Sequence, residues 1–352
     1  MIDSDKKLGA FLPALDAAPW IAVDTEADSL HSYPEKLCLL QISIPGRDEL
    51  VDTLADFDLQ PLWDLLKPRE LLLHGADYDL RLFSKHHGFV PGKIFDTMIA
   101  ARLLGVEQFG LANLVKQFLD IALEKGPQKS DWSRRPLTPR MEEYARNDTR
   151  HLQPLVELLR TELKSKGRMA WQEESCARLI EDNSNVPPQD PERVWRIKYS
   201  SKLSRPGLAV LREIWQWRED EATRADKPPF YIIKHETLVA IADAAGHGKH
   251  FDRLIPHRYS QRRRRALFDA VKRGQNCPPD QRPEPLRSRG YRASEKEKSD
   301  CDRLKKVRDR KAEELGIDAT LIASKDTLES LTRIDNTAAW HGLMSWQREL
   351  LR

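Results

Sequence analysis

The sequence predicts a layered α/β domain followed by all-helical domains. Residues 1–165 alternate short apolar runs with stretches of helical spacing, which is typical of an α/β fold. Residues 192–272 carry helical spacing throughout, and proline-rich segments stand on either side of them. These three observations predict domains over 1–181, 192–275 and 291–352.

The elements of the first domain are predicted from apolar spacing and from the turn residues around each run. Four strands are expected, at 20–25, 38–44, 49–52 and 70–74. Six helices are expected, at 57–66, 77–87, 96–104, 111–119, 139–145 and 148–165. Spacing alone does not separate this order of elements from that of other α/β folds.

Two linkers separate the predicted domains. Residues 182–191 contain three prolines together with Asn and Ser, and residues 276–290 are again rich in proline. Between the linkers, apolar residues recur at helical spacing from Leu208 onward. Beyond the second linker the pattern weakly repeats, with Val307 where Trp217 stands in the first copy, which predicts a second and more divergent helical bundle.

Two carboxylates end the first predicted strand. The apolar run that ends at Val23 is followed by Asp24, Thr25 and Glu26. Side chains alternate between the faces of a strand, so Asp24 and Glu26 share one face. Two such carboxylates repel each other unless a cation lies between them, and their oxygens are ligands that Mg²⁺ and Mn²⁺ prefer. The alternative is an ordinary strand with a polar outer face.

Acidic residues also stand at the start of one later helix and near the end of another. Asp77 and Asp79 lie in the first turn of the helix expected at 77–87, where the positive helix end favours acids. Tyr144 and Asp148 are four residues apart and so share one helix face. Each pair also fits a structural alternative: a first-turn acid, or a surface helix that buries a tyrosine.

Together these three segments resemble the DEDDy 3′–5′ exonuclease family, and the ribonuclease D branch within it. The resemblance covers about residues 8–165, and the segments at 37–43, 95–105 and 129–137 support it. It implies a ribonuclease H-like mixed sheet with flanking helices. A sister subclass has a histidine one residue before the tyrosine; that position is Glu143 here, so the chain resembles the tyrosine type.

The resemblance also implies roles for the site residues. Two divalent metal ions, Mg²⁺ or Mn²⁺, would be held by Asp24, Glu26, Asp79 and Asp148. Tyr144 would hydrogen-bond the attacking water, and Glu26 would help to orient it. Asp79 is preferred to Asp77 because its spacing from the apolar residues that follow matches that of the family's second acid.

Weaker candidates for substrate contact lie beside these motifs. Leu30 and Tyr33, between the first two strands, are expected to meet the 3′-terminal nucleotide, since an aromatic ring can stack on any base. Gln41 and His74 are expected near the acids. The alternative for Tyr33 is a loop tyrosine that covers the core. For Gln41 it is a polar strand residue, and for His74 a structural histidine at a strand end.

The helical region after the first linker resembles an HRDC domain, a small bundle also found in RecQ-type helicases. The similarity lies in residues 217–219 and in a proline followed by a helix. The most basic run of this region consists of Arg262, Arg263, Arg264 and Arg265. These arginines are candidate phosphate contacts; the alternative is a solvated helix face. The second bundle is expected either to bind RNA or to cap or orient the first domain.

Charge is divided unevenly along the chain. Residues 1–160 hold 19 Lys and Arg against 25 Asp and Glu, a net charge of −6, whereas residues 182–290 hold 22 against 14, a net charge of +8. A basic region attracts phosphate backbones by counterion release, and an acidic region repels them unless cations fill its site. This division predicts a metal-dependent catalytic domain joined to a nucleic-acid-binding domain, with an ordinary basic surface as the alternative.

Composition argues against several other classes of protein. The sequence contains no run of 18 apolar residues, so no membrane span is expected. The polar N-terminal segment lacks the basic and apolar parts of a signal peptide. The four cysteines are scattered without a C-x-x-C pair, so neither a zinc site nor a disulfide partner is expected. A reducing cytoplasm fits these features best.

The resulting expectation is a 3′–5′ exoribonuclease that trims RNA 3′ ends and releases nucleoside 5′-monophosphates. Precursors of tRNA are the substrate class that the resemblance implies. A 3′–5′ DNA exonuclease is the first alternative, because the motifs do not specify the sugar. A non-catalytic nucleic-acid-binding module with a decayed nuclease fold is the second.

Overall fold

The computed structural model describes residues 1–124, 126–184, 190–286, 291–333 and 338–352. Parts of both predicted linkers, at 185–189 and 287–290, lie outside the described residues. The chain divides into two compact units. The sheet unit consists of 1–27, 37–186 and 292–352, and the helical unit of 28–36 and 187–291. The predicted domain boundaries stay predictions.

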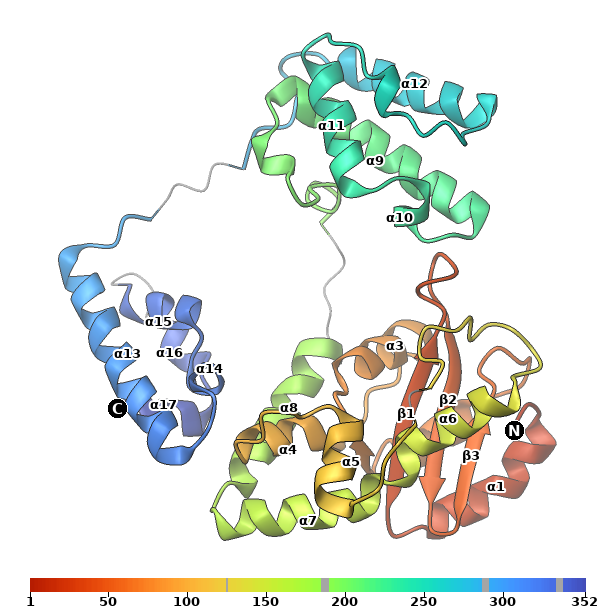
Figure 1. Cartoon of the computed structure of the whole chain (residues 1–352), viewed down its shortest axis with the longest axis vertical. Helices are drawn as coiled ribbons and strands as arrows, with labels where there is room; N and C mark the ends of the chain where they lie inside the picture. The colour runs from red at the N-terminus through yellow and green to blue at the C-terminus, as the bar shows by residue number, and fades with distance from the viewer. Residues whose placement is uncertain (125, 185–189, 287–290, 334–337) are drawn as a thin grey trace. The chain divides into compact units, whose positions relative to one another are not determined.

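A mixed five-stranded sheet forms the centre of the sheet unit (Figure 1). Its strands are β1 (Ile21–Ala27), β2 (Leu37–Ile44), β3 (Arg47–Val51), β4 (Glu70–Leu73) and β5 (Lys93–Asp96). The order is β3-β2-β1-β4-β5, with antiparallel pairing from β3 to β1 and parallel pairing from β1 to β5. The predicted α/β mixed sheet is therefore confirmed.

Within the described residues, eight helices accompany the sheet in the N-terminal part of this unit. They are α1 (Asp5–Ala17), α2 (Gln60–Leu66), α3 (Asp77–His87), α4 (Thr97–Leu103), α5 (Leu111–Leu119), α6 (Pro139–Arg150), α7 (Leu152–Ser165) and α8 (Met169–Ser184). The helices predicted at 139–145 and 148–165 divide at His151 instead, so that Tyr144 and Asp148 belong to one continuous helix.

The helices cover both faces of the sheet because apolar side chains alternate along the strands. Ile21 and Val23 pack with α1, α2 and α3 in one apolar core. Ala22 points to the other face and packs with α4, α5 and α7. On this second face α6 runs across β1, β2 and β3 (Figure 1).

The helical unit is an all-α bundle around a separate apolar core. Its elements are η1 (Ser200–Lys202), α9 (Arg205–Ala225), α10 (Pro229–Ile232), α11 (His235–Gly246), η2 (Asp252–Leu254) and α12 (Gln261–Gln275). The longest helix, α9, packs against α11 and α12. Trp217 is only 4% exposed and belongs to this core.

The C-terminal helices repeat the spacing of the helical unit. They are α13 (Glu295–Leu315), α14 (Ala319–Ile322), α15 (Lys325–Thr332), α16 (Ala338–His341) and α17 (Ser345–Leu351). The helices α13, α14 and α15 begin 90 residues after α9, α10 and α11 respectively. The assignment of this segment to a second HRDC-like domain stays a prediction.

The C-terminal helices share an apolar core with the helices on the second sheet face. Trp346 of α17 stacks on Trp171 of α8, with ring centroids 5.0 Å apart. Arg168 donates to the carbonyl oxygens of Leu103 (2.6 Å) and Leu315 (2.7 Å) and so joins the two parts. Within the described residues no helix is both long and apolar enough to cross a membrane.

Candidate active site

Asp24 and Glu26 occupy the last part of β1 on the face that α6 covers. Both alternate with the buried residues Val23 and Thr25, and both are half-buried. The pairing of β1 with β2 is regular up to Glu26, after which the register shifts. The strand therefore holds the two carboxylates side by side and then ends its regular pairing.

Asp79 reaches the same strand end from α3. It is 6% exposed, and its carboxylate accepts a hydrogen bond from the Thr25 hydroxyl. Asp77, two residues earlier, is exposed and forms an ion pair of 3.1 Å with Arg81. Of the two candidate acids in this turn, Asp79 is thus the one that lies beside Asp24.

Tyr144 and Asp148 are brought to the site by α6. The helix begins after Thr138, whose side chain accepts from the backbone N–H of Met141, and the tyrosine hydroxyl donates to the Asp148 carboxylate. The Tyr144 ring lies 6.1 Å from the ring of Trp132. A Cβ added at Gly126 would lie 1.5 Å from this ring, so backbone covers the tyrosine closely.

Burial, together with the charges of nearby carboxylates, raises the pKa values of all four acids. Burial and the neighbouring charges of Asp79, Asp148 and Glu26 raise the pKa of Asp24 well above its usual range. Burial, with the charges of Asp148 and Asp79, raises the pKa of Glu26 to about 9. Burial is also the main cause that raises the pKa of Asp79 to about 6 and that of Asp148 to about 7.

Among the described residues, no basic side chain is a cause of the pKa shifts of these four carboxylates, and such a donor set suits hard divalent ions. In the same part of the chain, no three His, Cys, Asp or Glu side chains are placed so that together they could hold a metal ion. Mg²⁺ commonly takes one or two carboxylates and completes its shell with water and substrate phosphate. The residues present therefore fit ions that share their coordination with substrate.

Asp96 is a residue of the site that sequence reasoning missed. It is fully buried and accepts backbone N–H groups from Gly75 (3.2 Å), Ala76 (2.7 Å), Met98 (2.7 Å) and Ile99 (3.1 Å). One carboxylate thus caps α4 and fixes the turn that leads into α3. An aspartate directly before an apolar helical run is an N-cap signature, and this signal could have identified it.

His74 and Gln41 lie near the acids but are not surface groups. The Nδ1 atom of His74 is 2.9 Å from the hydroxyl of Thr97, and burial lowers the histidine pKa. Gln41 is fully buried in β2, directly opposite Asp24. Substrate contact by either residue stays a prediction.

Leu30 and Tyr33 belong to segment 28–36 of the helical unit. Leu30 is exposed. The Tyr33 hydroxyl donates to Glu219, and its backbone N–H donates to Asp226 at 3.0 Å. The ring packs against the core of the helical bundle, which is the structural alternative for this residue; nucleotide stacking stays a prediction.

The four arginines at the start of α12 divide into two pairs. Arg262 donates twice to Glu221 at 2.7 Å, and Arg263 donates to the same carboxylate at 2.9 Å. Among the described residues, the side chains of Arg264 and Arg265 make no hydrogen bond or ion pair. Two of the four predicted phosphate contacts therefore also have a structural partner.

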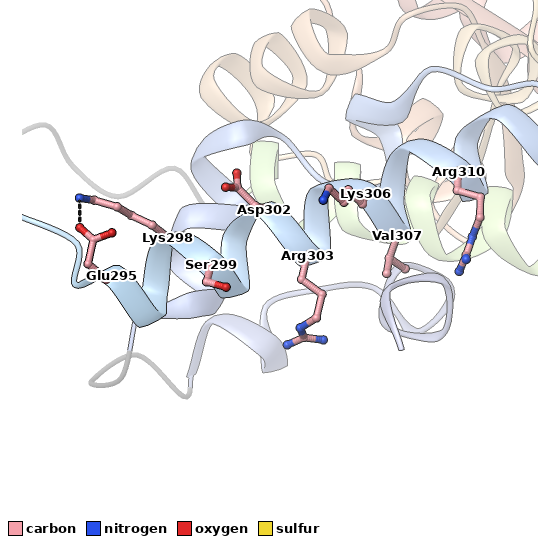
Figure 2. A pocket seen from close by; sticks show the side chains of 8 residues that line it. All are labelled: Glu295, Lys298, Ser299, Asp302, Arg303, Lys306, Val307 and Arg310. Atoms are coloured by element: carbon pink, nitrogen blue, oxygen red, sulfur yellow. Dashed lines mark hydrogen bonds and ion pairs between the residues drawn. The ribbon is translucent and has the colours of Figure 1, made fainter.

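A hollow of about 640 Å³ follows one face of α13 (Figure 2). Its lining is Glu295, Lys298, Ser299, Asp302, Arg303, Lys306, Val307 and Arg310. The charges are mixed, and Lys298 is paired with Glu295 at 2.7 Å. None of the predicted site residues lines it, so the acidic site on the sheet is a separate feature.

Two segments of the chain match known protein families. Residues 1–164 match the family description of 3′–5′ exonucleases, and residues 207–245 match that of the HRDC domain. The crystal structure of Escherichia coli RNase D, an exoribonuclease involved in structured RNA processing, is similar over 100% of this chain and 97% of that one. Its TM-score is 0.74 at 26% identity. The catalytic core of Trypanosoma brucei RRP6, as a cysteine-to-serine mutant, gives a TM-score of 0.64 at 26% identity over 80% of both chains.

Relatives in sequence lead to the same family. Ribonuclease D of Jannaschia sp. is 30% identical over 99% of this chain and 92% of its own length. Ribonuclease D of Zymomonas mobilis is 39% identical over 69% of this chain, a stretch that spans 63% of that relative. DEDDy exonucleases depend on divalent metal ions. The chain therefore belongs to the ribonuclease D family of 3′–5′ exoribonucleases.

Proposed function

We propose that this chain trims the 3′ ends of structured RNA, with tRNA precursors as the main substrate class, and releases nucleoside 5′-monophosphates. The observation that carries the proposal is the group of four carboxylates on β1, α3 and α6, whose pKa values are raised by burial and by nearby acidic charges. Such a group is costly to keep without cations and suits a phosphodiester substrate once cations are bound.

In this proposal the four carboxylates hold two divalent ions, Mg²⁺ or Mn²⁺. The carboxylates are those of Asp24, Glu26, Asp79 and Asp148. When bound, the ions stabilise the charge on the attacking and leaving oxygens of the phosphoryl group. Asp79 is kept in place by Thr25, and Asp148 by Tyr144, so the chain presents both carboxylates in fixed positions.

Tyr144 and Glu26 orient the attacking water. Burial and the charges of the nearby carboxylates raise the pKa of Tyr144 above its usual value, so the phenol keeps its proton at neutral pH. A protonated phenol positions a water molecule by hydrogen bonding, but it does not remove a proton as a strong base does. The close cover of its ring by Trp132 and Gly126 fixes where the hydroxyl points.

The helical unit is proposed to hold the body of the RNA. Its sequence is basic, and Arg264 and Arg265 are available for phosphate oxygens. The related Escherichia coli enzyme is described as acting in structured RNA processing, which supports a substrate with a folded body and a free 3′ end.

A time course on 5′-labelled RNA tests the proposal. A single-stranded oligonucleotide and a tRNA-like RNA with a 3′ extension are incubated with Mg²⁺, with Mn²⁺ or with chelator. We expect a descending ladder that requires metal, and trimming of the extension that stops at the folded body. Absence of degradation of both RNAs with either metal contradicts the proposal.

The same assay decides the nature of the sugar. A DNA oligonucleotide of identical sequence is expected to be degraded more slowly than the RNA. Equal rates indicate a general 3′–5′ exonuclease, in which case the RNA preference is wrong although the chemistry stands.

A further inference from the structure

Gln41 is a buried polar side chain without a partner. It is 0% exposed, and neither its amide oxygen nor its amide nitrogen is hydrogen-bonded within the described part of the chain. A buried polar group left without a hydrogen bond costs on the order of 1–3 kcal/mol. The amide therefore lacks a hydrogen-bond partner in this arrangement of side chains.

The strand register places Gln41 beside the metal-binding carboxylates. In the antiparallel β1–β2 pair, Gln41 stands directly opposite Asp24. Residues opposite each other in such a pair have Cβ atoms about 4.5–5.5 Å apart and point to the same face. The Gln41 amide and the Asp24 carboxylate thus share one face of the sheet.

The helix α6 closes this face above Gln41. Ser43, two residues along β2, shares the face, and its hydroxyl lies 2.7 Å from that of Thr149, the neighbour of Asp148. On the side away from Asp24, Gln41 is paired with Leu50 of β3, which is itself fully buried. The surroundings of Gln41 are therefore apolar toward β3 and acidic toward β1.

We propose that Gln41 is a positioning residue of the catalytic centre. When a divalent ion is bound, its amide N–H donates to the Asp24 carboxylate and holds that carboxylate toward the ion. A neutral amide suits this task because it orients the carboxylate without cancelling its charge, whereas a lysine or arginine would compete with the ion. Partners in the outer shell of a metal site affect its affinity by about 10–100-fold. This inference rests on the proposed function.

The decisive variant is Gln41→Met, which keeps the length of the side chain and removes both polar atoms. Calorimetric titration with Mn²⁺ alone, in the absence of RNA, is expected to show about 10–100-fold weaker binding. The free energy of unfolding of the metal-free protein should stay the same or rise, because an unpartnered buried amide has been removed. With RNA, kcat should fall while KM stays unchanged, since a fully buried residue does not touch the RNA.

Leu40→Met is the matched control. Leu40 is also fully buried in β2 but belongs to the opposite face, so this swap should leave Mn²⁺ affinity within twofold of wild type. If Gln41→Met does not fold, Gln41→Leu tests the same loss of polar atoms.

Two outcomes overturn different statements. Mn²⁺ affinity within twofold of wild type in the Gln41 variant overturns the positioning role and leaves the proposed function intact. If instead the wild-type protein neither binds Mn²⁺ nor loses RNA degradation in chelator, the proposed function itself is wrong.

Discussion

The carboxylates of the acidic site and the buried carboxylate of Glu221 have opposite electrostatic surroundings. On the sheet, four carboxylates stand together without a basic side chain among the causes that shift their pKa values, and those values rise. In the helical unit, Glu221 is 1% exposed and accepts hydrogen bonds from Arg224, Arg262 and Arg263. These arginines lower the pKa of Glu221 to about 2.

The difference lies in where the positive charge comes from. Arginines of the protein neutralise Glu221, whereas we expect the acidic site to need ions from solution. An ion pair completed by the protein is stable at neutral pH and has little need of a ligand. A group of acids that lacks its own cation is strained until ions arrive, and those ions bring open coordination positions for substrate. We therefore expect the acidic site to depend on metal and the Glu221 cluster to be independent of it.

The largest expected effect contrasts Asp79 with Asp77 at the start of α3. Asp79→Asn removes a buried carboxylate of the acidic site and should lower the rate of RNA degradation by about a thousandfold or more. Asp77→Asn alters only an exposed ion pair with Arg81 and should stay within about twofold of wild type. Initial rates on 5′-labelled RNA measure both, and equal losses in the two variants contradict the assignment of Asp79.

The next effect is on stability and concerns Glu221. Glu221→Gln removes the charge that three arginines share, and we expect the free energy of unfolding to fall by about 1.5–3 kcal/mol. Metal-dependent degradation of a short single-stranded RNA should persist at a temperature where the variant is folded. Glu213→Gln, which breaks one half-exposed pair with Arg273, is the control and should cost less than about 1 kcal/mol in urea unfolding.

The Glu221 cluster also predicts a pH dependence. Its folded-state pKa, about 2, is lower than its ordinary value, so its contribution to stability is present above about pH 4.5 and is lost as the pH falls toward 2. The difference in unfolding free energy between wild type and Glu221→Gln should therefore be smaller at pH 3 than at pH 7. A difference that is the same at both pH values removes Glu221 as an ionised partner of the arginines.

The acidic site was more accessible to sequence reasoning than the Glu221 cluster. The two carboxylates of β1 and the pair Tyr144 and Asp148 each follow a local period, so their shared faces could be predicted from spacing alone. Glu221 and Arg262 are 41 residues apart, and no local pattern links them. Long-range pairing within a helical bundle depends on tertiary packing, which spacing does not encode.

Sequence reasoning missed some elements of the fold because their local patterns are weak or misleading. The strand β5 has four residues with an exposed lysine first, too short for a clear strand pattern, and part of it was assigned to the following helix. The helix α1 contains Pro13, a residue that normally interrupts a helix. The full burial of Gln41 could not be predicted either, because it depends on α6, a helix about a hundred residues further along the chain; substrate contact by Gln41 stays a prediction.

The smallest expected effect tests whether the arginines of α12 are divided as their partners indicate. Arg265 is exposed and unpaired within the described residues, whereas Arg263 is bound to Glu221. If Arg265 meets a phosphate, Arg265→Ala should reduce the slope of log affinity against log salt concentration by about 0.7–0.9. Arg263→Ala should lower stability and leave that slope unchanged. Binding of a catalytically inactive Asp24→Asn background to tRNA-like RNA, measured at several salt concentrations, compares the two. A lower slope in the Arg263 variant would mean that the Glu221 cluster opens to accept RNA, and the contrast between a closed ion pair and an open acidic site would then be one of degree.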